Sequence, residues 1–365
     1  MEFEKVREED VLKLLEERKF ADVRDLLKDM EPIDIAELLE EMPEEKLPLL
    51  FRILPKEMAA DTFVEMDSDM QEYLIQTFSD KELKEVMVDM YLDDTVDMIE
   101  EMPANVVRRI LKHTSPEMRI KINGILQYPK DSAGSMMTTE YVDLRKDMTV
   151  QDAFTRIRRT GVDKETIYTC YVVNNNRMLL GMVSVKDLLL HNYDDVIEDI
   201  MEPNVIYATT LEDQEHVAEQ FSKYDFIALP VVDMEQRLVG IITVDDAMDV
   251  MEQEATEDIE KMAAIMPTEK PYMKTSVFET YKKRIPWLLL LMISATFTSM
   301  IIKHYEAALA TAAILSAYIP MLMDTGGNAG GQVSVTVIRA LSLHDIEYSD
   351  VPAIIWKELR VALCC

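Results

Sequence analysis

Two short stretches, GMVSVKD (Gly181–Asp187) and GIITVDD (Gly240–Asp246), repeat one pattern fifty-nine residues apart. Each begins with glycine, continues with hydrophobic residues and a Ser or Thr, and ends with Asp. A short apolar run and a turn precede each copy, and such β-branched runs between helical segments predict strands. We therefore expect two similar α/β halves, residues 131–199 and 200–251, each built as helix–strand–strand–helix and packed as a pseudo-symmetric pair.

The chain before this pair is predicted to be entirely helical. In residues 1–130 the apolar positions recur at spacings of three and four, and prolines stand at helix starts. The stretches DMEPIDIAELLEEMP (29–43) and DMYLDDTVDMIEEMP (89–103) share seven of fifteen positions, and LPKEMAADTFVEMD (54–67) is a looser copy. Short helices that repeat in this way predict an all-α superhelical domain, each unit burying its apolar face against the next.

Charge and composition narrow the class of function. The chain has 69 acidic and 38 basic residues, and all but six of the acids precede Lys282. Such an acidic surface repels nucleic acid and attracts cations. The three cysteines have no framework spacing, and the five histidines match no zinc motif. Because the sequence also lacks a P-loop and an activated Ser or Cys constellation, we expect no enzyme.

Acidic residues gather in three groups. Asp245, Asp246, Asp249, Glu252, Glu254, Glu257, Asp258 and Glu260 crowd one predicted helix, Asp93, Asp94 and Asp97 another, and Asp213, Glu215 and Asp225 lie in the second α/β half. Facing carboxylates repel one another, by about 4 kcal/mol at 4 Å and an effective dielectric of 20. Divalent cations would join such surfaces, and Mg²⁺ suits them because it keeps several waters and needs few carboxylates. A solvated acidic face is the alternative for each group.

The last quarter of the chain is predicted to cross a lipid bilayer. Residues 286–302 carry no charge, and a second uncharged run begins at Ala307, so we expect spans at about 286–302 and 307–341 and the start of a third near Trp356. Lys282, Lys283 and Arg284 place the N-terminal side in the cytoplasm by the positive-inside rule. A buried helical hairpin of a soluble protein is the alternative.

The second span contains MLMDTGGNAGGQVSV (Met321–Val335), which is unusually polar for a membrane segment. Asp324, Asn328 and Gln332 recur every four residues and form one helical stripe, between two overlapping GxxxG pairs. We expect Pro320 to kink the helix. An acid inside a membrane usually faces a water-filled path or a partner helix, so this stripe is a candidate ion pathway. A tight helix-packing seam is the alternative.

The duplicated stretches resemble a tandem CBS module. In that family the last Asp of the pattern often binds the ribose of an adenine nucleotide, and Asp187 and Asp246 stand at those positions. The resemblance implies ATP or another adenine nucleotide as a ligand, with a purely structural CBS pair as the alternative.

The whole order of segments resembles the MgtE-type magnesium channel/transporter family. The resemblance implies a homodimer in the cell (plasma or inner) membrane, multi-pass, with cytoplasmic N-terminal domains and magnesium sites that close the pore. It assigns a connecting "plug" helix from about Gln253 to Pro271, within a segment 252–281, and a membrane domain in 282–365. The family has five membrane helices per subunit, so this chain by itself is not expected to conduct.

The resemblance also assigns residues by position. The metal-sensing acids would be Asp61, Asp93, Asp97, Asp213, Glu215, Asp225, Asp246, Asp249, Glu254, Glu257 and Asp258. The pore residues would be Pro320, Gly326, Gly327, Asn328 and Gln332, beside the intramembrane Asp324.

These observations support a magnesium channel or transporter that cytosolic Mg²⁺ closes by joining acidic surfaces. One competing hypothesis is a membrane-tethered CBS sensor that binds adenine nucleotide and regulates a partner without moving ions. A scaffold is another, because the helical repeats also resemble stacking domains of a flagellar rotor protein.

Overall fold

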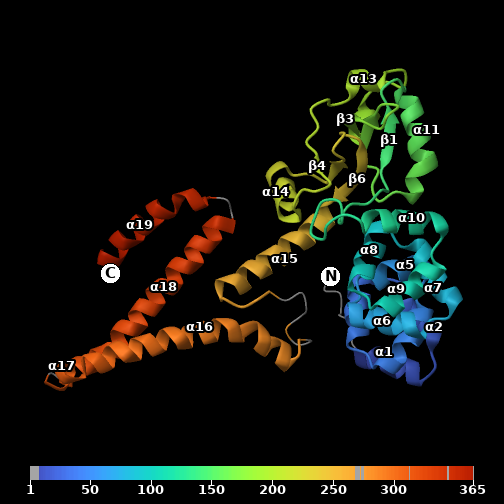
Figure 1. The fold of residues 1–365 in the computed structure, drawn as a ribbon. Helices are drawn as coiled ribbons and strands as arrows, with labels where there is room; N and C mark the ends of the chain where they lie inside the picture. Colours follow the sequence, from blue (N-terminus) through green and yellow to red (C-terminus); the bar gives the residue numbers. More distant parts are fainter. Residues whose placement is uncertain (1–7, 268–271, 273–274, 312, 343–344, 365) are drawn as a thin grey trace. The chain divides into compact units, whose positions relative to one another are not determined.

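Two units make up the chain, residues Met1–Met248 and Asp249–Cys365. The computed structural model describes residues 8–267, 272, 275–311, 313–342 and 345–364. The first unit contains a helical domain and a pair of small sheets, and the second contains long helices (Figure 1). This confirms the predicted fold class of helical domain, α/β pair, long connecting helix and helical C-terminal region.

From residue 8, where the described part of the chain begins, ten short helices form the N-terminal domain of the first unit (Figure 1). They are α1 (Glu8–Glu16), α2 (Phe20–Leu27), α3 (Pro32–Glu40), α4 (Leu47–Ile53, after the 3₁₀ turn Glu44–Lys46), α5 (Lys56–Val64), α6 (Ser68–Thr77), α7 (Asp80–Asp89), α8 (Leu92–Glu101), α9 (Ala104–His113) and α10 (Pro116–Ile125). The repeated sequences correspond to α3 and α8.

The helices stack as the repeat predicts. Helix α3 packs on α5, α5 on α7 and α7 on α9, so each element covers the one two places earlier. Between them the rings of Phe51, Phe63 and Phe78 lie 5.1 to 6.3 Å apart, at the centre of a continuous apolar core. Each short helix is stable only because its neighbours bury its apolar face.

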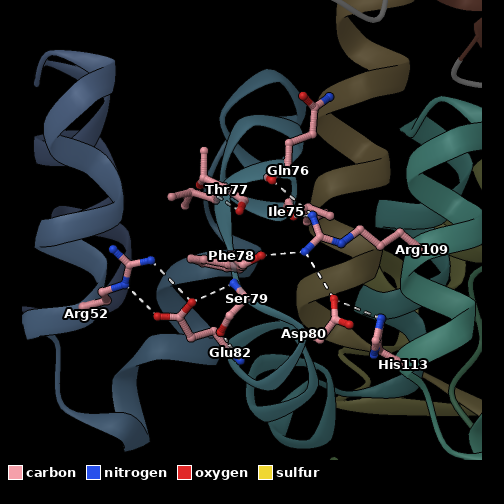
Figure 2. A network of polar contacts seen from close by, with 11 residues as sticks. Arg52, Ile75, Gln76, Thr77, Phe78, Ser79, Asp80, Glu82, Arg109 and His113 are labelled. Atoms are coloured by element: carbon pink, nitrogen blue, oxygen red, sulfur yellow. Dashed lines mark hydrogen bonds and ion pairs between the residues drawn. The ribbon is translucent and has the colours of Figure 1, made fainter.

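A polar network fixes the end of α6 (Figure 2). The guanidinium of Arg109, on α9, donates hydrogen bonds to the carbonyls of Ile75, Gln76 and Phe78, which the end of α6 leaves without helical partners. Arg109 Nη2 also lies 3.6 Å from a carboxylate oxygen of Asp80, the first residue of α7. One side chain thus ties together three helices.

The rest of the first unit contains two three-stranded sheets and the helices that connect and follow their strands. The first half contains β1 (Val142–Arg145), α11 (Val150–Thr160, followed by the 3₁₀ turn Gly161–Asp163), β2 (Thr169–Val173), β3 (Leu179–Ser184) and α12 (Val185–Leu190), and α13 (Ile197–Ile200) follows it. The second contains β4 (Ala208–Thr209), α14 (Gln214–Tyr224), β5 (Ala228–Val232), β6 (Leu238–Thr243) and α15 (Val244–Met262). In each half the first strand is parallel to the second, which is antiparallel to the third. The parallel strands β1 and β4 were not predicted, because both are very short.

The two halves exchange backbone pairing, and this explains the glycines that begin the signature. Thr138, near the start of the first half and ahead of β1, pairs with Ile241 of β6, and Glu202, near the start of the second half and ahead of β4, pairs with Met182 of β3. A Cβ atom at position 240 would lie 2.7 Å from the carbonyl oxygen of Thr138. Only glycine permits so close an approach of two backbones.

The connecting helix is shorter at its C-terminal end than predicted. Helix α15 begins inside the second half and ends at Met262, whereas we expected helix to about Pro271. Ala264 adopts a left-handed conformation with φ of 53°, and the N–H of Ile265 bonds the carbonyl of Glu260, which closes the helix as a Schellman motif. Pro267 then disfavours further helix in the residue before it. Part of the predicted helix, residues 268–271, lies outside the described residues.

The C-terminal region, where we predicted the membrane spans, forms α16 (Val277–His304), α17 (Glu306–Thr311), the 3₁₀ turn Ala313–Ala317, α18 (Tyr318–Ser342) and, after the 3₁₀ turn Tyr348–Asp350, α19 (Val351–Cys364). The predicted second span is therefore broken before Tyr318. Pro320 lies in the first turn of α18 and does not kink a helix interior as expected, since the missing N–H there has no helical partner to lose. Within the described residues, α16 alone combines the length and hydropathy of a membrane-crossing helix.

Candidate functional site

Asp93, in the first turn of α8, is the most unusual side chain of the candidate site because it is a buried acid. Asp93 is 5% exposed, although α8 belongs to an apolar repeat. Its carboxylate accepts a bond from the neighbouring N–H of Asp94, at 3.2 Å. Among the described residues no Lys, Arg or His forms an ion pair with Asp93. A buried carboxylate without a counter-charge is costly, so it is expected to bind a proton or a cation.

Each CBS-like half adds one acid near Asp93, Glu165 from the first half and Asp246 from the second. Asp246, in the first turn of α15, accepts a hydrogen bond from the hydroxyl of Thr243 at 2.6 Å. Glu165 lies in the loop before β2, held by a bond from its N–H to the carbonyl of Glu140. One carboxylate oxygen of Glu165, Oε2, is buried without a hydrogen-bond partner. We call Asp93, Asp94, Glu165 and Asp246 the acidic cluster.

The acids of this cluster raise one another's pKa values. Burial, and then the neighbouring acids, raise the pKa of Asp94 to about 6 and that of Glu165 to about 8. Burial also raises the pKa of Asp246 to about 7, although the bond from Thr243 opposes the shift. The pKa of Asp93 is raised well above its ordinary value by burial and by Asp246. The protein does not compensate full ionisation of these acids with basic groups among the described residues, so the cluster favours taking up protons or a cation.

Two predicted acids lie at the rim of this cluster. Asp97 is exposed, yet its pKa is raised by the protein around its carboxyl and by Asp246, so solvent screens it more than Asp93. Asp61, on α5, is also exposed, and burial of its carboxyl and the charge of Asp89 raise its pKa. The structure thus brings Asp61, Asp93, Asp97 and Asp246 into one electrostatic neighbourhood.

The donor set suits a hydrated cation better than a closed metal cage. Among the described residues no three His, Cys, Asp or Glu side chains converge tightly enough to ligate one ion directly. Mg²⁺ keeps several of its waters and needs only one or two carboxylates. The orphaned oxygen of Glu165 and the unpaired, buried Asp93 fit that role, because each lacks the positive partner that burial demands.

The acids of the second half do not form one site in this chain. Asp213 caps the start of α14, where its carboxylate accepts the N–H of Glu215 at 3.0 Å. Asp225 ends the same helix in a left-handed conformation. The eleven residues of α14 separate the two ends by about 16 Å. Asp213 and Glu215 therefore lie together, and Asp225 lies apart from them.

The remaining acids that we predicted to sense Mg²⁺ lie on the part of α15 that belongs to the second unit. Asp249 and Glu254 precede Glu257, which forms an ion pair with Lys261 one turn later. Asp258 accepts a hydrogen bond from Ser342 and faces Arg339 at 3.7 Å, both at the end of α18. Unlike the acidic cluster, Glu257 and Asp258 have basic partners within the protein.

The Asp of each CBS-like signature serves the local fold. Asp187 accepts the hydroxyl of Ser184 at 2.5 Å and completes a capping box at the start of α12. Asp246 bonds Thr243 in the same way at the start of α15. A Ser or Thr three residues before an acid is the usual sequence of such a box, so the pattern has a structural reason besides any nucleotide.

The predicted pore residues share α18 and are all exposed. Asp324, Asn328 and Gln332 follow one another at single-turn spacing, and the amide of Asn328 donates to the carbonyl of Asp324 at 3.0 Å. A Cβ atom at Gly326 or Gly327 would meet nothing within 4 Å. The polar stripe and the glycines are therefore open surfaces on this chain.

Sequence reasoning missed Glu165 and the contact between Asp258 and Arg339. Glu165 belongs to the loop DKETIY, which has no acidic run and no helical spacing. Glu165 comes close to the acids of α8 and α15 only in the folded chain, and no sequence pattern predicts this proximity. The contact between Arg339 and Asp258 could not be predicted for the same reason, because the two residues are eighty-one positions apart in the sequence.

Known families match in the order of the domains. The MgtE intracellular N domain matches residues 30–131, the CBS domain matches 133–193 and 197–253, and the family "Divalent cation transporter" matches 319–365. The chain is 36% identical over 319 residues to the magnesium transporter MgtE of Thermus thermophilus, covering 86% of this chain and 71% of that protein. It is 32% identical over 303 residues to MgtE of Bacillus subtilis, covering 83% and 67%.

Solved structures of soluble parts of magnesium transporters are similar to about two thirds of this chain. The cytosolic domain of the Mg²⁺ channel MgtE in complex with ATP superposes with a TM-score of 0.63 at 36% identity, covering 66% of this chain and 98% of that one. The soluble part of a magnesium transporter gives a TM-score of 0.62 at 30% identity, covering 68% and 98%. By sequence, domain order and fold, this chain belongs to the MgtE family of magnesium transporters.

Proposed function

We propose that the chain serves Mg²⁺ transport across a membrane and that its cytosolic domains sense Mg²⁺. The relatives that support the transport function are magnesium transporters, and the match to the divalent cation transporter family covers the polar stripe of α18. An inside-negative membrane potential would drive entry, at about 2.3 kcal/mol per charge per 100 mV. Transport would be the work of a multi-pass membrane domain with α16 and α18 among its helices.

The acidic cluster is the observation that carries the sensing proposal. Asp93 and Asp246 come from the helical domain and the CBS pair respectively, and neither has a basic partner among the described residues. At low Mg²⁺ their repulsion would favour separation of the two domains. Bound Mg²⁺ would neutralise the cluster, draw the domains together and act through α15 on the membrane helices, which closes the path.

The proposal extends to the assembly and the membrane. We infer a homodimer in the cell membrane with its N-terminal domains in the cytoplasm. Three large apolar side chains, Leu189 and Leu190 at the end of α12 and Tyr193 just after it, are exposed and would be covered by a second subunit. The basic triplet Lys282–Arg284 at the start of α16 supports a cytoplasmic N-terminal side.

A nucleotide is the second proposed ligand. The related cytosolic domain was solved in complex with ATP, and Asp187 is the residue here that we propose to bind the ribose. A tethered nucleotide sensor that moves no ion is the less favoured function, because the matched transporter domain would then have no role. Titration of the chain with ATP, with and without Mg²⁺, measures the binding directly.

Limited proteolysis across a Mg²⁺ series tests the sensing proposal. We expect millimolar Mg²⁺ to protect the first unit, whereas Na⁺ at matched ionic strength does not. The double variant Asp93→Asn/Asp246→Asn should be protected already in chelator and respond little to Mg²⁺, because its repulsion is gone. Asp34→Asn, on the equivalent repeat helix α3, should respond as the unmodified chain does.

Two outcomes would refute the sensing proposal. One is equal protection of the unmodified chain in chelator and in Mg²⁺. The other is an unchanged Mg²⁺ response in the double variant. Uptake of Mg²⁺ by liposomes that carry the protein, with its dependence on internal Mg²⁺, tests transport separately.

A further inference from the structure

Asp258 occupies a distinctive position in the second unit. It lies in the last turns of α15, and its side chain is 15% exposed in a unit whose helices are otherwise largely open. The same carboxylate oxygen, Oδ2, accepts the hydroxyl of Ser342 and lies 3.7 Å from Nη1 of Arg339. Both partners belong to the last turn of α18. The connecting helix is therefore joined to the end of the proposed pore helix by one carboxylate.

A second contact joins the same region to the first membrane helix. The N–H of Met266 bonds the carbonyl of Lys283 at 3.3 Å, and the ammonium of Lys283 bonds the carbonyl of Pro267 at 2.7 Å. The segment just after α15 is thus held to α16 by backbone and side chain. A movement of α15 would reach both long helices through these contacts.

The acids in the C-terminal part of α15, beyond Asp249, have different partners from those of the acidic cluster. Glu257 pairs with Lys261, and Asp258 pairs with Arg339, so the protein itself supplies positive charge here. Arg339 keeps 52% of its side chain exposed and makes a single long contact with Asp258. A one-point contact to so exposed a guanidinium is weaker and more readily replaced than a buried, two-point guanidinium–carboxylate pair.

We propose that Arg339 is a built-in cation that occupies Asp258 when Mg²⁺ is absent, and that Mg²⁺ displaces it. This inference rests on the proposed function, because it takes α15 to be where Mg²⁺ acts. Binding then exchanges one contact for another: Asp258 gains the metal, and the end of α18 loses its link to α15. Arg339 thereby sets the Mg²⁺ concentration at which the connecting helix responds.

Amide hydrogen exchange in α15, measured on the full chain in lipid nanodiscs, tests whether Mg²⁺ displaces Arg339 from Asp258. In chelator, Arg339→Gln should speed exchange in residues 249–262, because the helix loses its anchor. Over a Mg²⁺ series, the midpoint of protection should fall by about two- to fivefold, the range expected for loss of an exposed ion-pair competitor. Arg339→Lys, which keeps the charge, should restore most of both effects.

Arg360→Gln is the matched control, since it removes the same charge from α19, where the side chain bonds the carbonyl of Trp356. It should leave α15 unchanged. Unaltered exchange in α6 and α9 of the same sample shows that the variants remain folded.

The outcomes separate this inference from the function on which it rests. If α15 of the unmodified chain gains no protection from Mg²⁺, both fail. In another outcome, Mg²⁺ protects α15 of the unmodified chain while Arg339→Gln changes neither the hydrogen-exchange rate in chelator nor the Mg²⁺ midpoint of protection. That result refutes the displacement of Arg339, and the proposed function stands. An equal shift in Arg360→Gln also refutes it, because the effect would then be one of general charge.

Discussion

Asp93 is the residue at which a structural repeat departs from its own pattern. In the first copy of the repeat the equivalent position is Ile33, whereas the next residue is acidic in both copies, Asp34 and Asp94. Stacking the helices therefore does not require an acid at position 93. Since burial of an unpaired carboxylate opposes folding, its presence indicates a role beyond the fold.

The acidic cluster predicts that the first unit loses stability as pH rises. Burial raises the pKa of Asp246 to about 7 and that of Glu165 to about 8 in the folded chain, whereas unfolded carboxyls have a pKa of about 4. Between these values the folded state binds more protons, so the free energy of unfolding falls with pH. In chelator, we expect the melting temperature of the first unit to decline from about pH 5 to 8.

Mg²⁺ and a variant provide the controls for this pH dependence. Saturating Mg²⁺ should flatten the decline, because the ion supplies the charge that protons supplied. Glu165→Gln should reduce the slope in chelator and raise stability at pH 8. A melting temperature that rises with pH in chelator, or a slope unchanged by Glu165→Gln, would contradict the coupling.

Arg109 is predicted to be the residue on which the end of α6 depends. Arg109→Ala leaves three carbonyls without their donor and should lower the local free energy of unfolding by about 1–3 kcal/mol. Native-state hydrogen exchange of the α6 amides measures this value. Arg108→Ala, at the neighbouring exposed position on α9, should change it by less than about 0.5 kcal/mol. Equal effects of the two substitutions would contradict the capping role.

At the scale of elements, the exchanged pairing of the two CBS halves depends on Gly240. Gly240→Ala would place a Cβ atom 2.6 Å from the sulfur of Met137 and 2.7 Å from the carbonyl oxygen of Thr138. The methionine can move, but the carbonyl is fixed by its hydrogen bond to Ile241. We expect a loss of about 1–3 kcal/mol of stability, measured by hydrogen exchange of β6.

Gly124 provides the matched substitution for this prediction. It lies in α10, where an added Cβ atom meets nothing within 4 Å. Gly124→Ala should stabilise α10 by about 0.5–1 kcal/mol, because alanine has the higher helix propensity. If Gly240→Ala proved as harmless as Gly124→Ala, the backbone approach between the halves would not be the constraint on the signature.

At the scale of the whole molecule, charge should set the orientation in the membrane. Replacing Lys282, Lys283 and Arg284 together by Glu removes the basic residues in front of α16 and should reduce the fraction of chains whose N-terminal units remain in the cytoplasm. Protease accessibility of the first unit in sealed vesicles measures this fraction. The exposed Lys112, Lys121 and Lys130 of the first unit offer a control set, because all three precede α16 by more than 140 residues in the sequence. The same loss after their replacement would contradict a local topology signal.

Much of the architecture could be predicted from the sequence because the relevant signals are local. Helical spacing, the repeat at α3 and α8, the duplicated signature and the apolar α16 each lie within a short window. The residues at which helices begin and end were harder to predict from the sequence. Whether α15 stops at Met262 depends on a left-handed Ala264, and whether Pro320 kinks or starts a helix depends on where the preceding turn breaks.

The sequence by itself determined the family, the order of the domains and which acids were worth considering, because these follow from residue types and spacings along the chain. Only the tertiary structure decided how the acids are grouped. It added Glu165 to the cluster, placed Asp225 at the far end of α14 from Asp213, and gave Asp258 a basic partner in α18. The physical reason is that burial and the nearest opposite charge set a carboxylate's behaviour, and both depend on segments that are distant in sequence.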